Sequence, residues 1–275
     1  MRVASALKIL ALCATCLAPG AAQARDPAPV SLPKLVSLDE CADQYVLGLV
    51  ERDRVLALSD HARYADSYFR DRAQGIRRIK PRLESVLALH PDMVVRAWGG
   101  DLRLIQALQR RGIKVVDIDD VQSYAAARAQ LFKVGAALDA EAGAQIAAHR
   151  FDEALSQVRN IGRGRTVIYY TPSGTSAGPD TLTGDMLKTL GFKLAVTRSG
   201  YFSISPESLI AMKPDVFALG YYDDRYAMRR VPGRQPLVRA LIEKTPHFAL
   251  PDAAMACGGW FSLYALRDLS QETVP

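Results

Sequence analysis

Short apolar runs alternate with amphipathic stretches along most of the chain. The runs have the length of buried strands and fall at residues 34–38, 55–58, 114–118, 166–170 and 216–219. Apolar side chains at helical spacing follow several of these runs, at residues 41–50, 101–111 and 182–190. Gly112 and Gly191 stand where two of these helices would end. Because strands that alternate with helices pair in parallel, the pattern predicts parallel sheets with helices on both faces.

One segment of the chain occurs twice. Residues 84–95, ESVLALHPDMVV, align without a gap with residues 207–218, ESLIAMKPDVFA, and the Glu, Ser, Ala, Pro and Asp positions coincide. Each copy has the pattern of a short helix, a Pro-Asp turn and a buried strand, and a glycine follows each strand. Two α/β units of this kind indicate two similar lobes.

The region between the two copies is rich in alanine and has little strand pattern. It predicts a helix over 121–138 and a longer one over 139–161, which would span about 35 Å. Few glycine or serine residues interrupt the second stretch, in contrast to a flexible linker. The predicted fold class is therefore α/β, with two lobes, each a parallel-sheet α/β sandwich, joined by one long interlobe helix. The corresponding domains are an N-terminal lobe over 25–120, a linking helical region over 121–163 and a C-terminal lobe over 164–275.

The first 24 residues have the pattern of a cleavable signal peptide. Arg2 and Lys8 give a positive start, an apolar stretch reaches Ala18, and residues 22–24 fit a cleavage site at Ala24. The alternatives are a retained membrane anchor or a buried first helix. No later stretch approaches 18 uninterrupted apolar residues, so we expect export to the periplasm and no membrane span beyond this segment.

The charge of the chain is modestly basic. Its 35 Lys and Arg against 29 Asp and Glu give +6, which is low for a nucleic-acid binder, and no motif that reads nucleic acid is present. Between positions 63 and 82, seven basic residues face only two aspartates. This segment is either an anion-recognising rim, since arginine binds carboxylate and phosphate well, or a solvated helical face. The residues leave both interpretations open.

Five short motifs stand at the ends of the predicted strands and helices. They are residues 36–38 before 41–43, residues 89–94, residues 97–100, residues 171–174 before Gly184, and residues 212–216. In this order, over about residues 34–270, the chain resembles the periplasmic substrate-binding proteins of ABC importers. More narrowly, it resembles their iron-chelate (siderophore) and cobalamin-binding family with a helical backbone.

This resemblance implies a function. It implies a periplasmic protein, not an enzyme, that captures a ferric siderophore or a corrinoid such as cobalamin in an interlobe cleft. It implies an ABC permease with its ATPase as partners, and no cofactor of the protein's own. In the family, one glutamate on each lobe docks on arginines of the permease, and the matching positions are Glu84 and Glu207. A charge pair at equivalent places suits a two-fold partner, whereas the alternative is that each glutamate only stabilises its helix N-terminus.

Ligands of open α/β sheets bind beyond the carboxyl ends of the strands. Trp98 falls at such a point and matches a ligand-contacting tryptophan of the cobalamin-binding relatives; the alternative is a tryptophan in a lobe core. An aromatic ring there suits a corrinoid, whereas the basic segment over 63–82 suits an anionic ferric chelate. The residues do not decide between the two. The ligand-binding candidates are Cys41, His61, Tyr64, Arg96, Trp98, Tyr201, Phe202, Tyr221, Cys257 and Trp260.

Cys41 and Cys257 are the cysteines that follow the predicted signal peptide. Three interpretations stay open: a disulfide, which the oxidising compartment favours; two thiols that meet the ligand or a soft metal; or two buried thiols. No set of His, Asp and Glu residues has the spacing of a metal site, so we expect no resident metal.

An exported α/β hydrolase is the alternative from a different class. Ser173 or Ser176 would be its nucleophile, and His61 or His247 would have to lie about 3 Å away as the base. The chain lacks the Gly-x-Ser-x-Gly, P-loop and His-Glu-x-x-His motifs, which disfavours catalysis.

Overall fold

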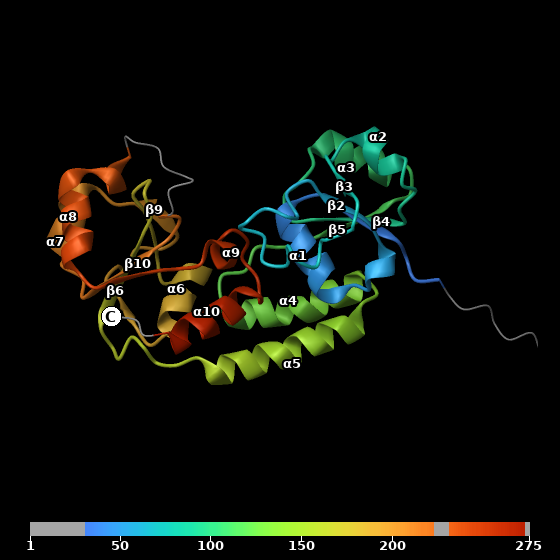
Figure 1. Cartoon of the computed structure of the whole chain (residues 1–275). Helices are drawn as coiled ribbons and strands as arrows, with labels where there is room; N and C mark the ends of the chain where they lie inside the picture. The colour runs from blue at the N-terminus through green and yellow to red at the C-terminus, as the bar shows by residue number, and fades with distance from the viewer. Residues whose placement is uncertain (1–30, 223–230, 273–275) are drawn as a thin grey trace, which may run out of the picture. The chain divides into compact units, whose positions relative to one another are not determined.

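Eleven strands and ten α-helices order the part of the chain that the structure describes, residues 31–222 and 231–272 of a computed structural model (Figure 1). The predicted signal peptide, residues 1–24, lies outside the described residues. The strands are β1 (Leu35–Ser37), β2 (Val55–Ser59), β3 (Arg78–Ile79), β4 (Met93–Arg96), β5 (Lys114–Asp117), β6 (Thr166–Tyr170), β7 (Thr175–Ala177), β8 (Lys193–Leu194), β9 (Tyr201–Ser203), β10 (Val216–Leu219) and β11 (His247–Ala249). The helices are α1 (Glu40–Leu49), α2 (Leu83–Leu87), α3 (Leu102–Gln109), α4 (Tyr124–Ala137), α5 (Glu141–Gln157), α6 (Leu182–Thr189), α7 (Pro206–Met212), α8 (Pro236–Lys244), α9 (Asp252–Met255) and α10 (Ser262–Gln271).

Two parallel sheets form the framework. The first sheet has the strand order β3-β2-β1-β4-β5, and the second has the order β11-β10-β6-β8. Every neighbouring pair in both sheets is parallel. A short antiparallel pair, β7 with β9, accompanies the second sheet. Helices alternate with the strands, so the prediction of an α/β fold with a parallel sheet in each half is confirmed.

The two copies of the repeated segment fold alike. Each begins with a short helix, α2 or α7, and ends in a central strand, β4 or β10. His90 and Lys213 occupy the same place in the two copies. Both have left-handed backbone, with φ of 49° and 44°, and such a residue ends a helix. The repeat therefore extends to backbone conformation as well as to sequence.

The aspartate of each copy fastens two neighbouring strands together. The Asp92 carboxylate accepts the Lys34 N–H just before β1 at 2.7 Å. The Asp215 carboxylate accepts the Thr166 N–H at the start of β6, also at 2.7 Å. Because β1 pairs with β4 and β6 pairs with β10, the Pro-Asp dipeptide has the same structural role in both halves.

Helices α4 and α5 connect the two sheets along the chain and lie side by side (Figure 1). Their close packing depends on glycine. A side chain at Gly135 of α4 would meet the Ala144 methyl group of α5, and one at Gly143 would overlap the Leu49 carbonyl of α1. Helix α4 therefore packs closely against α5, and α5 packs closely against α1, which makes this connection stiff.

The connecting helices are shorter than the sequence pattern predicted. Helix α5 has 17 residues and spans about 25 Å, whereas the predicted helix over 139–161 would span about 35 Å. Asp139 has a left-handed φ of 50°, which interrupts the helical backbone between α4 and α5. The backbone becomes extended at Val158, which ends α5.

The C-terminal segment packs against the first half of the chain. Trp260 is 1% exposed, and its ring centre lies 4.8 Å from that of Tyr45 on α1 and 6.1 Å from that of Phe69. Gly48 makes room for the indole, since a Cβ at this position would lie 2.6 Å from it. The interpretation of Trp260 as a ligand contact was therefore wrong, because this side chain belongs to the hydrophobic core.

We expect Trp260→Ala to lower the free energy of unfolding by about 3–5 kcal/mol, because it empties a filled core position. Trp98→Ala is the matched control, since these are the two tryptophans of the chain and Trp98 is 68% exposed. The control should change the free energy of unfolding by less than about 0.5 kcal/mol. Denaturant unfolding followed by circular dichroism measures both variants, and equal losses would contradict the burial of Trp260.

Candidate functional site

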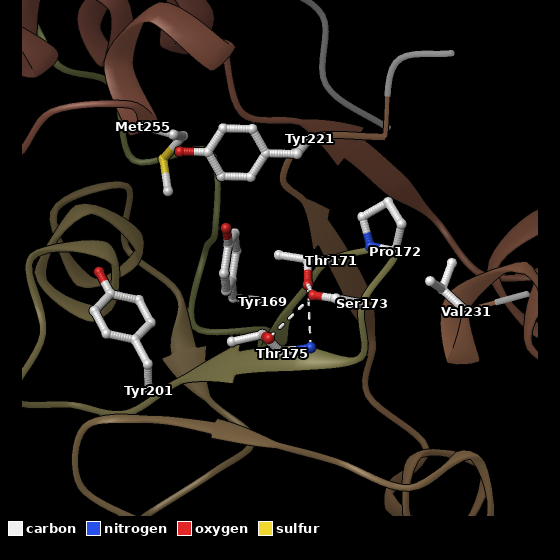
Figure 2. A pocket seen from close by; sticks show the side chains of 9 residues that line it. All are labelled: Tyr169, Thr171, Pro172, Ser173, Thr175, Tyr201, Tyr221, Val231 and Met255. Atoms are coloured by element: carbon white, nitrogen blue, oxygen red, sulfur yellow. Dashed lines mark hydrogen bonds between the residues drawn. The ribbon is translucent and has the colours of Figure 1, made fainter. Parts of the chain in front are cut away.

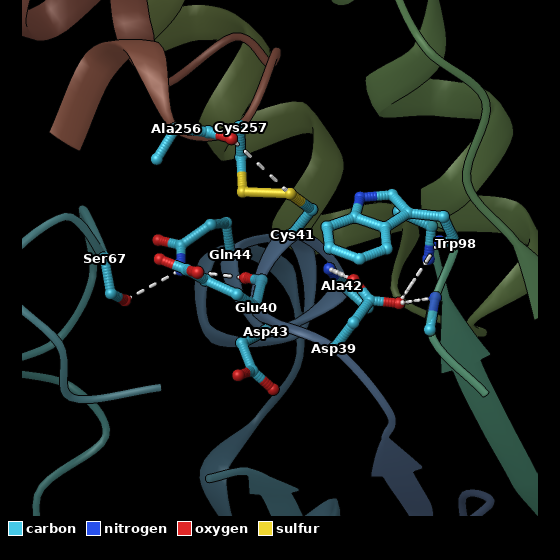
Figure 3. Close-up of a disulfide and its surroundings, with 12 residues drawn as sticks. Asp39, Glu40, Cys41, Ala42, Asp43, Gln44, Ser67, Trp98, Ala256 and Cys257 are labelled. Atoms are coloured by element: carbon cyan, nitrogen blue, oxygen red, sulfur yellow. Dashed lines mark hydrogen bonds between the residues drawn. A yellow bond between two sulfur atoms is a disulfide. The ribbon is translucent and has the colours of Figure 1, made fainter. Parts of the chain in front are cut away.

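The carboxylate of Asp39 organises the carboxyl edge of the first sheet. It caps α1 by accepting the Ala42 N–H at 2.9 Å. Its second oxygen accepts the N–H groups of Ala97 and Gly99, each at 2.8 Å. These bonds hold the turn that follows β4, and this turn carries the exposed side chain of Trp98 (Figure 3).

A disulfide lies next to this turn. Cys41 in the first turn of α1 and Cys257 after α9 have α-carbons 5.3 Å apart and their sulfur atoms are bonded (Figure 3). Of the three interpretations of these cysteines, the structure contains the disulfide, so neither sulfur is a thiolate that binds a soft metal. Because α1 follows β1 and α9 follows β11, the bond ties the carboxyl ends of the two sheets to each other.

Carboxylates crowd beside the disulfide. Burial, together with the charges of Asp66 and Asp43, raises the pKa of Glu40 to about 7. Burial also raises the pKa of Asp43 to about 6, although the Ser59 N–H and hydroxyl donate to this carboxylate at 3.0 and 2.6 Å. The first turn of α1 therefore changes its charge in the neutral pH range.

The second sheet carries a pocket of about 460 Å³ at its carboxyl edge (Figure 2). We call it the tyrosine pocket. Its lining consists of three tyrosines, three hydroxyl side chains and three apolar residues, namely Tyr169, Tyr201, Tyr221, Thr171, Ser173, Thr175, Pro172, Val231 and Met255. They come from β6 and the turn after it, from the start of β7, from β9, from the turn after β10, from α9 and from the segment before α8. Figure 2 shows the three rings and the Met255 side chain gathered around one space.

Tyr169 is the buried member of the tyrosine pocket. Burial raises the pKa of Tyr169 far above its ordinary value, and electrostatic repulsion from the nearby Tyr221 and Tyr201 phenols raises it further. The Tyr169 phenol therefore stays protonated. Glycine is required at position 220, because a Cβ there would overlap the Tyr169 hydroxyl. Tyr221, the next residue, has a left-handed φ of 56°, a strained conformation of the kind found at ligand sites.

The hydroxyl groups after β6 bond to one another. The Thr171 and Ser173 hydroxyls are 2.9 Å apart, and the Ser173 and Thr175 hydroxyls are 3.1 Å apart. The Thr175 N–H donates to the Thr171 hydroxyl at 3.0 Å. This network fixes the turn and places donors and acceptors at the rim of the tyrosine pocket.

Two of the ligand-binding candidates are engaged elsewhere. The Arg96 guanidinium pairs with the Asp117 carboxylate at 3.1 Å. The ring of Phe202 packs under the Arg198 guanidinium, which lies 4.8 Å from the ring centre. Neither Arg96 nor Phe202 lines the tyrosine pocket, whereas Tyr201 and Tyr221 do.

Tyr169 and Met255 line the tyrosine pocket, although the sequence pattern does not predict either as a site residue. Tyr169 lies inside the apolar run of β6, where its pattern is that of a core residue; the available signal was the Tyr-Tyr pair before a Gly- and Ser-rich turn. Met255 has no local signal. It precedes Cys257 by two residues, so the disulfide holds the chain next to it against α1.

The residues of the alternative hydrolase are not assembled. Ser173 bonds to threonine hydroxyls, and the His61 ring stacks on Tyr64 with ring centres 4.6 Å apart. His247 Nδ1 lies 3.0 Å from the backbone oxygen of Thr245. Ser176 is fully buried. Within the described residues, the hydrogen-bond partners of Ser173 are therefore hydroxyls and not imidazoles.

The basic segment over 63–82 is not a helical face. It consists of turns that lead into β3. Several of its arginines donate to backbone oxygens: Arg70 to Ala65 and Ser67, Arg72 to Leu47, and Arg78 to Asp60. A guanidinium that already donates to backbone oxygens has fewer donors left for an anionic ligand.

No helix in residues 31–222 or 231–272 is long and apolar enough to cross a bilayer. Across the same two ranges, no three His, Cys, Asp or Glu side chains are placed to hold a metal ion.

The chain belongs to the periplasmic binding protein family, because the model of that family matches residues 35–221. Members are the solute-binding components of ABC importers, which implies a periplasmic location and permease partners. They are transport proteins rather than enzymes and carry no cofactor of their own.

Solved structures of two-lobe periplasmic binding proteins share the fold. A possible iron-binding (periplasmic solute-binding) protein of Staphylococcus epidermidis has a TM-score of 0.68 at 19% identity, covering 86% of this chain and 97% of that one. The periplasmic heme-binding protein RhuT of Roseiflexus has a TM-score of 0.66 at 20% identity, covering 88% of this chain and 97% of that one. The periplasmic vitamin B12 binding protein BtuF of Vibrio cholerae has a TM-score of 0.60 at 17% identity, covering 88% of this chain and 98% of that one. No curated protein matches the chain.

We expect the free energy of unfolding to rise as the pH falls from about 8 to about 5.5. A carboxyl whose pKa is raised in the folded state binds its proton more tightly there than in the unfolded chain. Glu40 therefore destabilises the fold above pH 7, and this penalty is lost as the pH falls through its folded pKa. Glu40→Gln should reduce the change in the free energy of unfolding over this pH range by about 1 kcal/mol. The effect is modest because solvent screens this partly exposed side chain.

Denaturant unfolding at several pH values measures this dependence. Glu243→Gln is the control, because Glu243 is an exposed glutamate. If the Glu40 variant and the parent protein show the same slope, the proton is not held at Glu40.

Proposed function

We propose that this protein captures an iron complex, such as a ferric siderophore, or a corrinoid in the periplasm and delivers it to an ABC permease. The tyrosine pocket carries the proposal, because three aromatic rings and a thioether surround about 460 Å³ at the carboxyl edge of a parallel sheet. Ligands of open α/β sheets bind at this edge. The names of similar structures support the same ligand class, since those proteins are described as binding iron, heme or vitamin B12.

The chemistry of the lining suits a flat or macrocyclic metal complex. The rings of Tyr169, Tyr201 and Tyr221 pack against such a ligand, and the hydroxyls after β6 bond to polar groups at its rim. Because Tyr169 stays protonated, it offers a hydrogen-bond donor rather than a phenolate. Trp98 supplies a further exposed ring at the carboxyl edge of the first sheet.

In this proposal the two sheets are the frameworks of two lobes, over 25–120 and 164–275, joined by the helical region over 121–163. The Cys41–Cys257 disulfide supports a ligand site between them, because it ties together the sheet edges that carry Trp98 and the tyrosine pocket. The ligand would be held by side chains of both lobes.

Glu84 and Glu207 are the proposed contacts to the permease. They are the second residues of α2 and α7, both are exposed, and they hold the same place in the two repeats. A hydrogen bond from its own backbone N–H, aided by Ser205, holds the pKa of Glu207 below its ordinary value, so it stays anionic. Two anions at equivalent places suit cationic side chains on a two-fold partner.

Titration of the mature protein with a ferric siderophore, hemin and cobalamin tests the ligand class. We expect one of them to bind one-to-one, without turnover, and to change the fluorescence of Trp98. Tyr201→Ala or Tyr221→Ala should weaken binding about tenfold, because each removes a ring from the pocket. Phe202→Ala, next to Tyr201 but outside the pocket, should not. The absence of any saturable response would count against the proposed function.

Charge reversal tests the docking contacts. The double variant Glu84→Lys and Glu207→Lys should abolish uptake by cells while the affinity for ligand stays unchanged, because both residues lie outside the tyrosine pocket. Glu243→Lys, another exposed glutamate, is the control and should transport normally. A loss of ligand affinity in the double variant would refute the docking role.

A further inference from the structure

A second cavity, of about 380 Å³, adjoins the tyrosine pocket. It is formed by the segment before α4, by the first turn of α6 and by residues around α9. Tyr201 and Met255 line both cavities. These two side chains therefore stand between the two cavities, which are close enough for one extended ligand to contact both.

Tyr201 is held in place at this boundary. Its hydroxyl lies 2.9 Å from the Thr183 hydroxyl, on the buried face of α6. Its ring is turned toward the tyrosine pocket (Figure 2). Met255 is held from the other side, because Cys257, two residues further on, is bonded to Cys41.

The second cavity differs from the tyrosine pocket in charge. Two exposed aspartates, Asp120 and Asp180, belong to its lining, and the described lining residues include no lysine, arginine or histidine. Asp180 accepts the Gly200 N–H at 2.8 Å, and this bond holds the pKa of Asp180 below its ordinary value. Lys188, whose charge acts on Asp180, donates to the Pro179 oxygen at 2.8 Å and is not part of the lining. The second cavity thus presents acceptor oxygens and negative charge.

We infer that the ligand has two parts, a metal-chelate core in the tyrosine pocket and an arm with N–H donors or an ammonium group in the second cavity. This inference rests on the proposed function and adds the chemistry of the arm. Carboxylates accept hydrogen bonds strongly from amide or ammonium N–H groups and repel other carboxylates. Among metal complexes, a corrinoid with amide side chains or a ferric hydroxamate with an ammonium tail fits, whereas heme with its two propionates does not.

Three probes of known charge test the inference: cobalamin with amide arms, ferrioxamine B with an ammonium tail, and hemin with propionates. We expect the protein to bind cobalamin or ferrioxamine B at least about tenfold more tightly than hemin. The double variant Asp120→Asn and Asp180→Asn should weaken the preferred probe about tenfold and strengthen hemin several-fold. The asparagine oxygen at position 180 still accepts the Gly200 N–H, so the loop keeps its bond.

Asp119→Asn is the matched control, because Asp119 adjoins Asp120 but pairs with Lys133 and does not line the cavity. Its affinities should equal those of the parent protein. Opposite changes for the preferred probe and for hemin support the inference, since damage to the fold would weaken both. Tighter binding of hemin by the parent protein, or parallel changes in the double variant, would overturn the inference and leave the proposed function standing. No saturable binding of any of the three probes would overturn both.

Discussion

The covalent bond between Cys41 and Cys257 is the constraint on which the arrangement of the site depends. It joins residues 216 positions apart, and in a chain-entropy account it stabilises the fold by about 5 kcal/mol. Its position has a further consequence, because it links the start of α1 to the segment after α9, at the carboxyl ends of both sheets. Met255 precedes Cys257 by two residues and lines both cavities, so the bond also fixes one wall of the site.

A single carboxylate adds a second, local constraint at the same edge. Asp39 caps α1 and at the same time accepts N–H groups of the turn after β4. The helix that carries Cys41 and the turn that carries Trp98 therefore share one anchor. Gly99 permits this approach, since a Cβ there would lie 2.5 Å from the Asp39 side chain. An anchored turn can present a large exposed ring without an ordering cost when ligand binds.

Local patterns explain what the sequence could predict. Strands, helices and the repeat depend on spacing along the chain, and the Pro-Asp turns appear in the structure with matching hydrogen bonds from Asp92 and Asp215. Trp260 could not be placed in this way. Its neighbours in sequence are equally compatible with a cleft and with a core. Its burial becomes evident only from its contact with Tyr45, more than two hundred positions away in the chain. Tyr169 could not be predicted as a site residue because its local pattern is unambiguous. A buried strand residue that also lines a pocket has the same sequence pattern as a residue of the core.

The packing between the halves limits how the protein responds to a ligand. One hydrophobic cluster contains Leu35 and Met93 of the first sheet, Phe151 of α5, and Val167 and Phe248 of the second sheet. A large rotation of one half against the other would open this cluster and expose apolar surface at about 25 cal/mol per Å². Binding is therefore expected to move side chains and turns rather than whole sheets. Under this constraint selectivity comes from groups that are already in place. In the proposed function these groups are the rings of the tyrosine pocket and the aspartates of the second cavity.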